Sequence, residues 1–240
     1  MGMQHVRRVA ETLGVRRGPA ATVLAMCWGT LAILVVAHVG FRQYRVPGDV
    51  DFALGRERGY GEVFFMIMTI WCVALCLALM WRLRAPVMGG WALGFGMLFV
   101  DDWFQLHERF GAVLGPSLGV RNALGEIVWL GALALVVGVA LVVLHLVAPA
   151  GTRSISAVLF GLAAALAVAG VGMDYLHSLT SGHGRWLNTV MIILEDGGEI
   201  LVMCLVTCYL FAVQALGHRP RVSGWFGRVT GVPAEHRALR

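Results

Sequence analysis

Long apolar runs separated by short polar stretches dominate this chain. Six of them approach the ~20 residues that an α-helix needs to cross a lipid bilayer. These runs cover residues 20–42, 60–81, 86–108, 124–147, 154–178 and 190–216. Pro19, Pro86 and Pro149 stand at run boundaries, where a missing backbone N–H does least harm. The pattern predicts an all-α integral membrane protein, a six-transmembrane helical bundle.

Composition supports this class. Hydrophobic residues make up 58% of the 240 residues and charged residues only 14%, whereas a soluble domain carries about 25% charged residues. Most of the chain is therefore expected to contact something other than water, and we expect the lipid bilayer to be its main partner.

The polar ends divide the chain into three parts. Residues 1–18 are basic, with apolar residues at helical spacing, and predict a short helix on the cytoplasmic membrane surface. Residues 19–216 form the expected transmembrane domain. Residues 217–240 form a basic cytoplasmic tail, which we expect to be flexible or interfacial.

Arginine indicates the orientation. The net charge is +5, and all nineteen basic residues are arginine. Twelve lie in the two ends, in the 82–85 turn and at Arg153, and seven lie in the other three loops. The positive-inside rule then places both termini in the cytoplasm of a multi-pass plasma-membrane protein. Because the arginines flank apolar runs and are not interleaved with exposed aromatic residues, we expect no nucleic-acid partner.

The acidic residues gather at the opposite, outer end. Twelve of the fourteen fall in the outer loops or in the outer halves of the predicted spans. Asp49, Asp51 and Glu57 are ordinary loop acids. Nine others lie within spans, where ionisable groups are costly and typically functional. They are Glu62, Asp101, Asp102, Glu108, Glu126, Asp174, Glu195, Asp196 and Glu199.

A repeat of three helical hairpins is suggested by two recurring features. Each odd-numbered run ends near a histidine, and each even-numbered run carries a Gly-Glu pair followed by a β-branched residue. The histidines are His38, His107 and His177, and the pairs are Gly61-Glu62, Gly125-Glu126 and Gly198-Glu199. Such hairpins would pack around a pseudo-threefold axis; coincidence in a glycine-rich chain is the alternative.

Helical spacing selects acids that can act together. Asp101 and Glu108 are seven residues apart and would share a helix face. Asp174 and His177 have the i,i+3 spacing of two-metal carboxylate bundles, and Glu195 and Glu199 are i,i+4 neighbours. One or two divalent ions would relieve the repulsion among these carboxylates. Mixed oxygen and nitrogen ligands suit iron, manganese or zinc. The predicted metal ligands are Asp101, Glu108, Glu126, Asp174, His177, Glu195 and Glu199.

Asp102 and His107 point elsewhere on a continuous helix, so they are assigned to metal-ligand support or catalytic proton transfer. The leading hypothesis is a metal-dependent membrane oxidoreductase or hydrolase acting on an apolar small molecule, a lipid or a quinone. His183, in the last outer loop, would cover the cluster or be solvated.

Four alternatives use the same residues. The acids would form a proton or cation pathway, although the inner halves of the spans are nearly devoid of polar groups. Arg109, Arg121 and Arg185 would neutralise them in structural ion pairs. The three histidines would ligate haem. The cluster would dock a partner of a non-catalytic subunit. The five cysteines are interpreted as packing residues, and His145 as an interfacial anchor.

Overall fold

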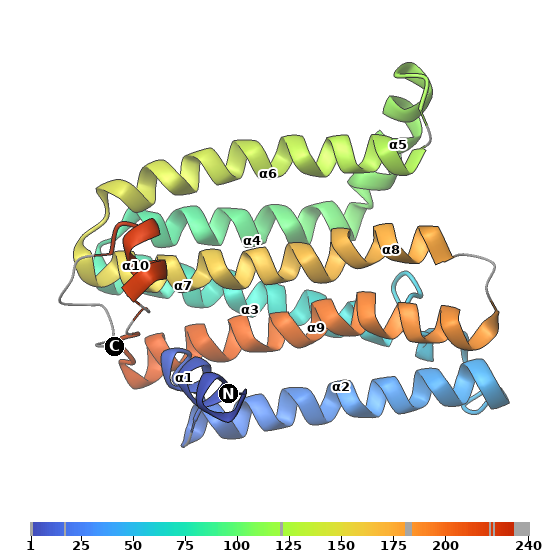
Figure 1. The fold of residues 1–240 in the computed structure, drawn as a ribbon, viewed down its shortest axis with the longest axis horizontal. Coiled ribbons are helices and arrows are strands. Elements are labelled where there is room, and N and C mark those ends of the chain that lie inside the picture. Colours follow the sequence, from blue (N-terminus) through green and yellow to red (C-terminus); the bar gives the residue numbers. More distant parts are fainter. Residues whose placement is uncertain are drawn as a thin grey trace.

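The computed structural model describes residues 2–16, 18–120, 122–180, 184–220, 222 and 224–232. These residues form helices joined by turns (Figure 1). The helices are α1 Gly2–Thr12, α2 Pro19–Tyr44, η1 Val50–Phe52, α3 Tyr60–Leu83, α4 Pro86–Phe104, α5 Leu106–Ser117, α6 Asn122–Val147, α7 Ala150–Ala167, η2 Val168–Gly172, α8 Met173–Thr180, α9 Arg185–Leu216 and α10 Gly224–Val229. The all-α prediction is confirmed, and so is the short helix predicted near the N-terminus. Arg17, Arg121 and His183 lie outside the described residues, as do residues 233–240 of the tail.

Five stretches of the described chain are long and apolar enough to cross a membrane. They are Pro19–Tyr44, Tyr60–Leu83, Leu124–Val147, Ala150–Thr180 and Arg185–Leu216. The remaining predicted span forms α4, which has 19 residues and carries Asp101 and Asp102 in its last turn. It runs beside the other long helices (Figure 1) but is not one of the five.

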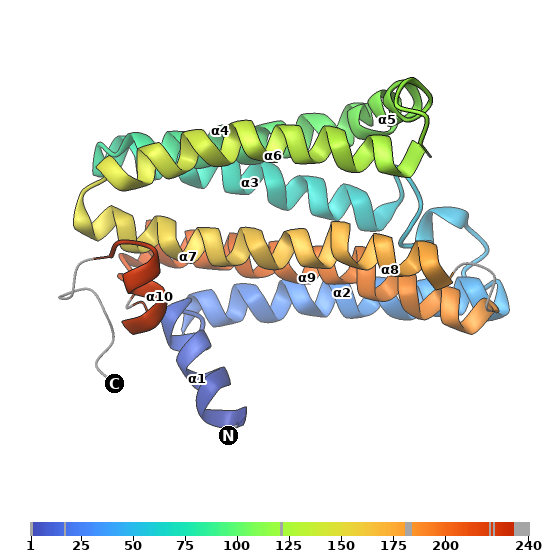
Figure 2. The ribbon, with the colours of Figure 1, turned by 45° about the horizontal axis from the view of Figure 1, so that its top comes forward.

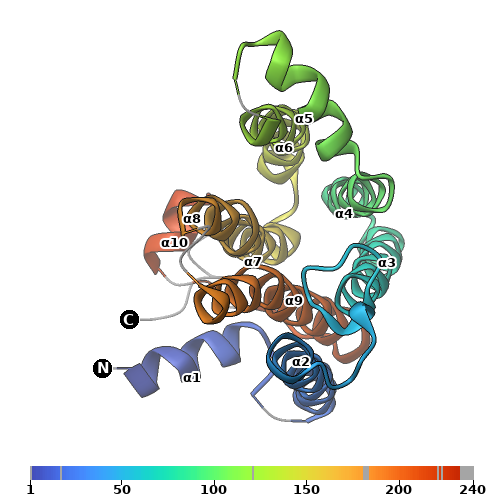
Figure 3. The same cartoon turned by 90° about the vertical axis from the view of Figure 1, so that its right-hand side faces the viewer.

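The long helices form two layers, which are visible in Figures 2 and 3. One contains α3, α4 and α6, with α5 at its end, and the other contains α2, α9 and the continuous series α7, η2 and α8. Helix α9 is central, because it packs against α2, α3, α7, η2 and α8. Helices α2 and α3 barely contact each other. The prediction of three equivalent hairpins is therefore wrong, because α2 and α3 pack against α9 and hardly against each other.

The half of the bundle nearer the termini contains closely packed apolar side chains. Its fully buried side chains include Leu79, Met88, Leu159 and Leu210. The Trp91 indole donates a hydrogen bond to Ser156 Oγ at 2.9 Å, which links α4 to α7.

The run predicted as one helix over 86–108 is two helices. Helix α4 ends at Phe104, Gln105 adopts a left-handed conformation with φ 52°, and α5 starts at Leu106. Such a conformation is unfavourable for a residue with a Cβ, so interactions across the break must compensate. The shared helix face predicted for Asp101 and Glu108 is therefore wrong.

Helix α5 replaces an expected loop and folds back onto α6 through glycines. A Cβ atom at Gly125 would lie 2.6 Å from the Gly111 carbonyl oxygen and 2.7 Å from the Gly115 nitrogen. Only residues without side chains allow this approach. The contact fixes α5, and with it His107 and Glu108, against α6.

Part of the described C-terminal segment packs against the bundle. His145 Nε2 lies 2.7 Å from the Thr230 carbonyl oxygen, and His218 Nε2 lies 2.8 Å from that of Thr12. Val222 and Val232 are buried. The interfacial role expected for His145 is wrong, because its ring is buried and holds the chain after α10.

Candidate functional site

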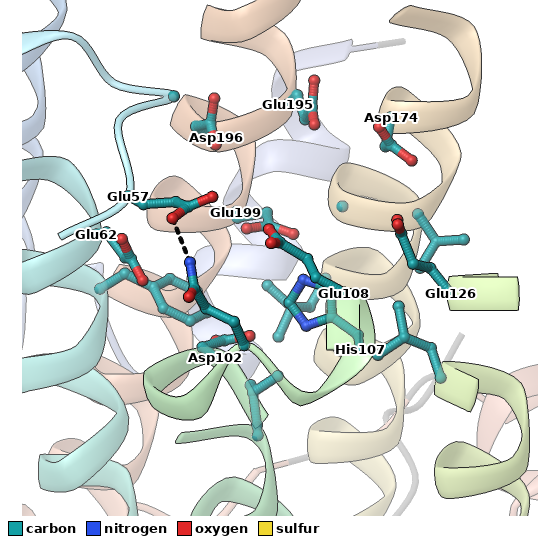
Figure 4. A pocket seen from close by; sticks show the side chains of 18 of the residues that line it. Glu57, Glu62, Asp102, His107, Glu108, Glu126, Asp174, Glu195, Asp196 and Glu199 are labelled. Atoms are coloured by element: carbon teal, nitrogen blue, oxygen red, sulfur yellow. Dashed lines mark hydrogen bonds between the residues drawn. The ribbon is translucent and has the colours of Figure 1, made fainter. Parts of the chain in front are cut away.

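A cavity of about 800 Å³ occupies the half of the bundle far from the termini. Its walls come from both layers and from the segment after η1 (Figure 4). Among the described residues, nine carboxylates line it, together with one histidine, His107, and one arginine, Arg56. The carboxylates are those of Glu57, Glu62, Asp102, Glu108, Glu126, Asp174, Glu195, Asp196 and Glu199. Eight of the nine acids expected within spans therefore share one cavity.

Little positive charge compensates these acids. Arg56 makes a long ion pair, 3.9 Å, with Asp51. In the part of the chain that the structure describes, neither Arg109 nor Arg185 forms an ion pair. The interpretation of the acids as structural ion pairs therefore has no support among these residues. Carboxylates this close together must be partly protonated or must bind cations.

Asp101 lies behind the cavity wall and holds His107. Its Oδ2 is 2.8 Å from His107 Nδ1, and its Oδ1 accepts a hydrogen bond of 2.8 Å from the Trp129 indole. The Asp101 side chain is only 2% exposed. Trp129 is in turn stacked on Phe110, with ring centroids 3.9 Å apart. Both carboxylate oxygens are thus used, and Asp101 acts by orienting an imidazole.

The break at Gln105 makes this arrangement possible. On a continuous helix Asp101 and His107 would point in different directions, but the left-handed residue turns His107 back toward Asp101. Ligand atoms of Asp101, Asp102 and His107 lie within 4.8 Å of one another. With Nδ1 bound to a carboxylate, Nε2 is the His107 nitrogen available to a ligand, and no described residue hydrogen-bonds it.

Glu199 reaches the same group from α9. Asp102 is the strongest of its charged neighbours, which also include His107. The carboxylate occupies space beside Gly170, where a Cβ atom would overlap Glu199 Oε1. Gly170 lies in η2, a single π-helical turn. Such turns are rare and often occur at functional sites; here the turn and the glycine together make room for the carboxylate.

A second group lies between α8 and α9. His177 Nδ1 is 2.7 Å from Glu195 Oε2, and its Nε2 is 2.8 Å from Asn188 Oδ1. Both ring nitrogens are engaged, so His177 connects the two helices and has no free nitrogen for a metal. Asp174 and Glu195 remain on the cavity wall.

Two of the remaining acids, Glu57 and Glu62, accept hydrogen bonds from neighbouring segments. The Gln105 amide donates a hydrogen bond to Glu57, and the Arg58 backbone N–H donates one to Glu62. Burial and the neighbouring Glu57 raise the pKa of Glu108. The hydrogen bond between His107 and the Asp101 carboxylate raises the pKa of His107. Both groups therefore hold a proton more readily than they would in water.

His38 supports the cavity from outside. It is fully buried in α2, and its Nδ1 accepts a hydrogen bond of 2.9 Å from the Leu54 backbone N–H. This bond holds the segment that carries Leu54 to Glu57 against the bundle. The three histidines proposed for haem ligation are thus each fixed by a different hydrogen bond.

One wall of the cavity is apolar. It consists of Ile127 and Leu130 from α6 and of Ala163, Leu166 and Val171 from α7 and η2. The cavity therefore combines acidic side chains with apolar ones from α6, α7 and η2.

Seven of the nine predicted site residues line the cavity, and Asp101 and His177 contact residues that do. Sequence reasoning missed Glu57, which it treated as an ordinary loop acid. It recognised Glu62 and Asp196 as span acids but assigned them no role. The glycine pair flanking Glu57, Gly55 and Gly59, is the only local signal of a tight segment there.

The comparisons with known proteins give a family without a function. Residues 20–213 match the family described as a domain of unknown function, DUF8692. The chain belongs to the DUF8692 family. No curated protein and no solved structure matches it. The matched region of this DUF8692 member contains every residue of the acidic cavity.

Proposed function

We propose that this DUF8692 protein is a metal-dependent membrane enzyme that acts on an amphiphilic, lipid-like substrate. In this proposal α4 joins the five apolar stretches as a sixth span. Both termini lie in the cytoplasm, and the cavity lies in the outer leaflet of the plasma membrane. The observation that carries the proposal is the 800 Å³ cavity with nine carboxylates, one oriented imidazole and an apolar wall.

The metal site is assigned to Asp102, His107 and Glu199. These side chains combine carboxylate oxygens with one imidazole, which suits a divalent iron, manganese or zinc ion. The support for His107 as a ligand is its bond to Asp101, because metal-bound histidines usually donate their other N–H to a carboxylate. Asp174, Glu195 and Glu126 provide oxygens for a second ion. This assignment exchanges the roles that the sequence suggested for Asp101 and His107.

A divalent ion in this site would polarise an oxygen of the substrate or activate a water. Glu108 lies beside His107 in the chain, lines the cavity and has a raised pKa. It is therefore proposed as the group that accepts and returns a proton. The apolar wall between α6 and η2 would hold the hydrocarbon part of the substrate while the head group meets the metal.

Cation translocation is the weaker proposal. Phe65 and Ile200 line the cavity and are buried, and the next residues inward on the same helix faces, Met68 and Met203, are fully buried. An ion pathway through this conformation would have to pass tightly packed apolar side chains.

The test is elemental analysis of detergent-purified protein beside Asp102→Asn and Glu199→Gln. Glu11→Gln, an exposed acid at the opposite end, is the control. One or two divalent ions per chain, lost in both cavity variants and kept in the control, would support the site. Turnover is then followed by lipid mass spectrometry of a membrane-lipid extract with metal-loaded and chelated protein. A metal-free protein that retains such turnover would exclude the proposal.

A further inference from the structure

All five cysteines of the chain lie outside the acidic cavity, on helices that pack against one another. Cys27 comes from α2, Cys72 and Cys76 from α3, and Cys204 and Cys208 from α9. Helices α2 and α3 both pack against α9. Every one of the thiols is buried. Met68 and Met203, both fully buried, lie among them. We call these seven residues the sulfur cluster.

Two thiol–thioether pairs form the centre of the sulfur cluster. Cys72 Sγ lies 3.8 Å from Met203 Sδ, and Cys204 Sγ lies 3.6 Å from Met68 Sδ. Both pairs join α3 to α9. Cys27 contributes from the third side, because it interacts with Cys204 and Cys208. Cys72 also lies 3.3 Å from the Thr207 hydroxyl.

These separations match those of sulfur ligands on one ion. Two sulfur atoms each about 2.3 Å from a metal lie roughly 3.8 Å apart at a tetrahedral angle. The spacing of either pair is therefore compatible with one bridging ion.

The apolar surroundings of the sulfur cluster favour an ion whose charge is neutralised by its ligands. Metal-bound cysteine is a thiolate, so one thiolate and one thioether carry a single negative charge. With a monovalent ion they form a neutral unit, which an apolar interior accepts, whereas a divalent ion would leave a buried net charge. Thiolate and thioether ligands are soft and select cuprous copper.

We propose that the sulfur cluster is a binding site for Cu(I). The ion is held by Cys72 with Met203. The equivalent pair, Cys204 with Met68, holds a second ion in the same way. Binding releases one proton from the cysteine and requires no change in oxidation state. This inference is independent of the divalent-metal site in the acidic cavity and uses different residues.

The sulfur cluster lies close to the acidic cavity but is separated from it by buried apolar side chains. On α3, Met68 is one helical turn beyond Phe65, and on α9, Met203 is one turn beyond Ile200. Phe65 and Ile200 both line the acidic cavity. The first sulfur ligands are thus about one helical turn from the cavity wall, and an ion entering from the cavity would have to displace the packed Phe65 and Ile200 side chains. Burial then keeps it away from water and oxidants.

The experiment is a Cu(I) titration of reduced, detergent-purified protein against a chromophoric Cu(I) chelator. We expect one or two Cu(I) per chain to be withdrawn from the chelator, with X-ray absorption giving copper–sulfur distances of about 2.3 Å. Met203→Leu and Cys72→Ala should each lower the affinity at least about tenfold. Met88→Leu, another fully buried methionine outside the sulfur cluster, should leave it unchanged.

Two further measurements keep the proposal falsifiable. Thermal unfolding of each apo-variant separates a lost ligand from a lost fold, because Met203→Leu conserves volume and should fold. Glu199→Gln should retain Cu(I), which separates this site from the divalent-metal site. The proposal is overturned if the protein takes no Cu(I) from the chelator. It is equally overturned if Met203→Leu and Cys72→Ala bind normally while Glu199→Gln does not.

Discussion

His107 is hydrogen-bonded to Asp101 across a break in the polypeptide helix, with Nδ1 and Oδ2 2.8 Å apart. The two residues lie on different helices, α4 and α5, on either side of left-handed Gln105. Because Asp101 also binds the Trp129 indole, its position is fixed by two elements. The imidazole that faces the acidic cavity is therefore oriented before any ligand arrives.

Asp101→Asn should weaken divalent-metal binding without removing a ligand. Loss of a carboxylate that orients a metal-bound histidine typically lowers affinity 10–100-fold. Titration of chelated protein with Zn²⁺ or Mn²⁺ measures this. Glu11→Gln is the matched control, because it removes a carboxylate at the far end of the bundle. Unchanged affinity in Asp101→Asn would show that the His107–Asp101 bond has no part in binding.

The same bond should make stability depend on pH. Its effect is to raise the pKa of His107 in the folded protein, so the stabilisation is complete below the unfolded pKa of about 6.5 and is lost as pH rises through the folded pKa. In chelated protein, His107→Gln should cost about 1.5–3 kcal/mol near pH 5.5 and less near pH 9. Thermal unfolding midpoints in detergent measure the difference. A cost that grows with pH would contradict this sign.

Gly170→Ala should displace Glu199, because the added methyl group would overlap its carboxylate. Overpacking of this kind costs about 1–3 kcal/mol, and the displaced ligand should weaken the divalent-metal site about tenfold or more. Gly172→Ala tests the same π turn at a position where the nearest neighbour, a Val168 methyl, is 3.9 Å away. Equal effects of the two substitutions would argue that the turn matters, not the space beside Glu199.

His177→Gln should lower stability and leave the metal in place. Both ring nitrogens are hydrogen-bonded, to Glu195 and Asn188, so the loss should be about 1–3 kcal/mol. Elemental analysis and thermal unfolding of the same preparation give both quantities. A stable protein that has lost metal would restore His177 to the ligand role expected from its spacing with Asp174.

Leu130→Trp should slow turnover of a lipid-like substrate by filling the apolar wall of the cavity. Metal content should not change, because the site is unaltered. Leu135→Trp, on the same helix but 66% exposed, adds the same bulk outside the cavity and should behave as wild type. Lipid turnover per bound metal is the measurement, and inhibition by both variants would point to a general effect on α6.

Much of this arrangement is readable from residue types. Apolar runs of membrane-spanning length form helices. Acids at one end of those runs lie close together, because ionisable groups in apolar surroundings need polar partners. The break at Gln105 had no such signal, since glutamine rarely adopts a left-handed conformation. The sequence therefore suggested Asp101 as a ligand and His107 as its support, and the proposed site reverses these two roles. The sequence does contain one signal for the packing of α5, because Gly111 and Gly115 have the spacing of close helix contacts.

The π turn of η2 also controls rotation along the chain. Each residue of an α-helix advances about 100° around the axis, and a π turn absorbs one extra residue within a wider ring. If Val168–Gly172 were α-helical, Asp174 and everything after it would be turned by roughly that angle, away from the acidic cavity. The turn therefore rotates α8 so that Asp174 lines the acidic cavity together with the acids of α9. A relative with one residue fewer in this turn and a regular helix in its place should keep Asp174 on the same face while losing the space that Glu199 occupies.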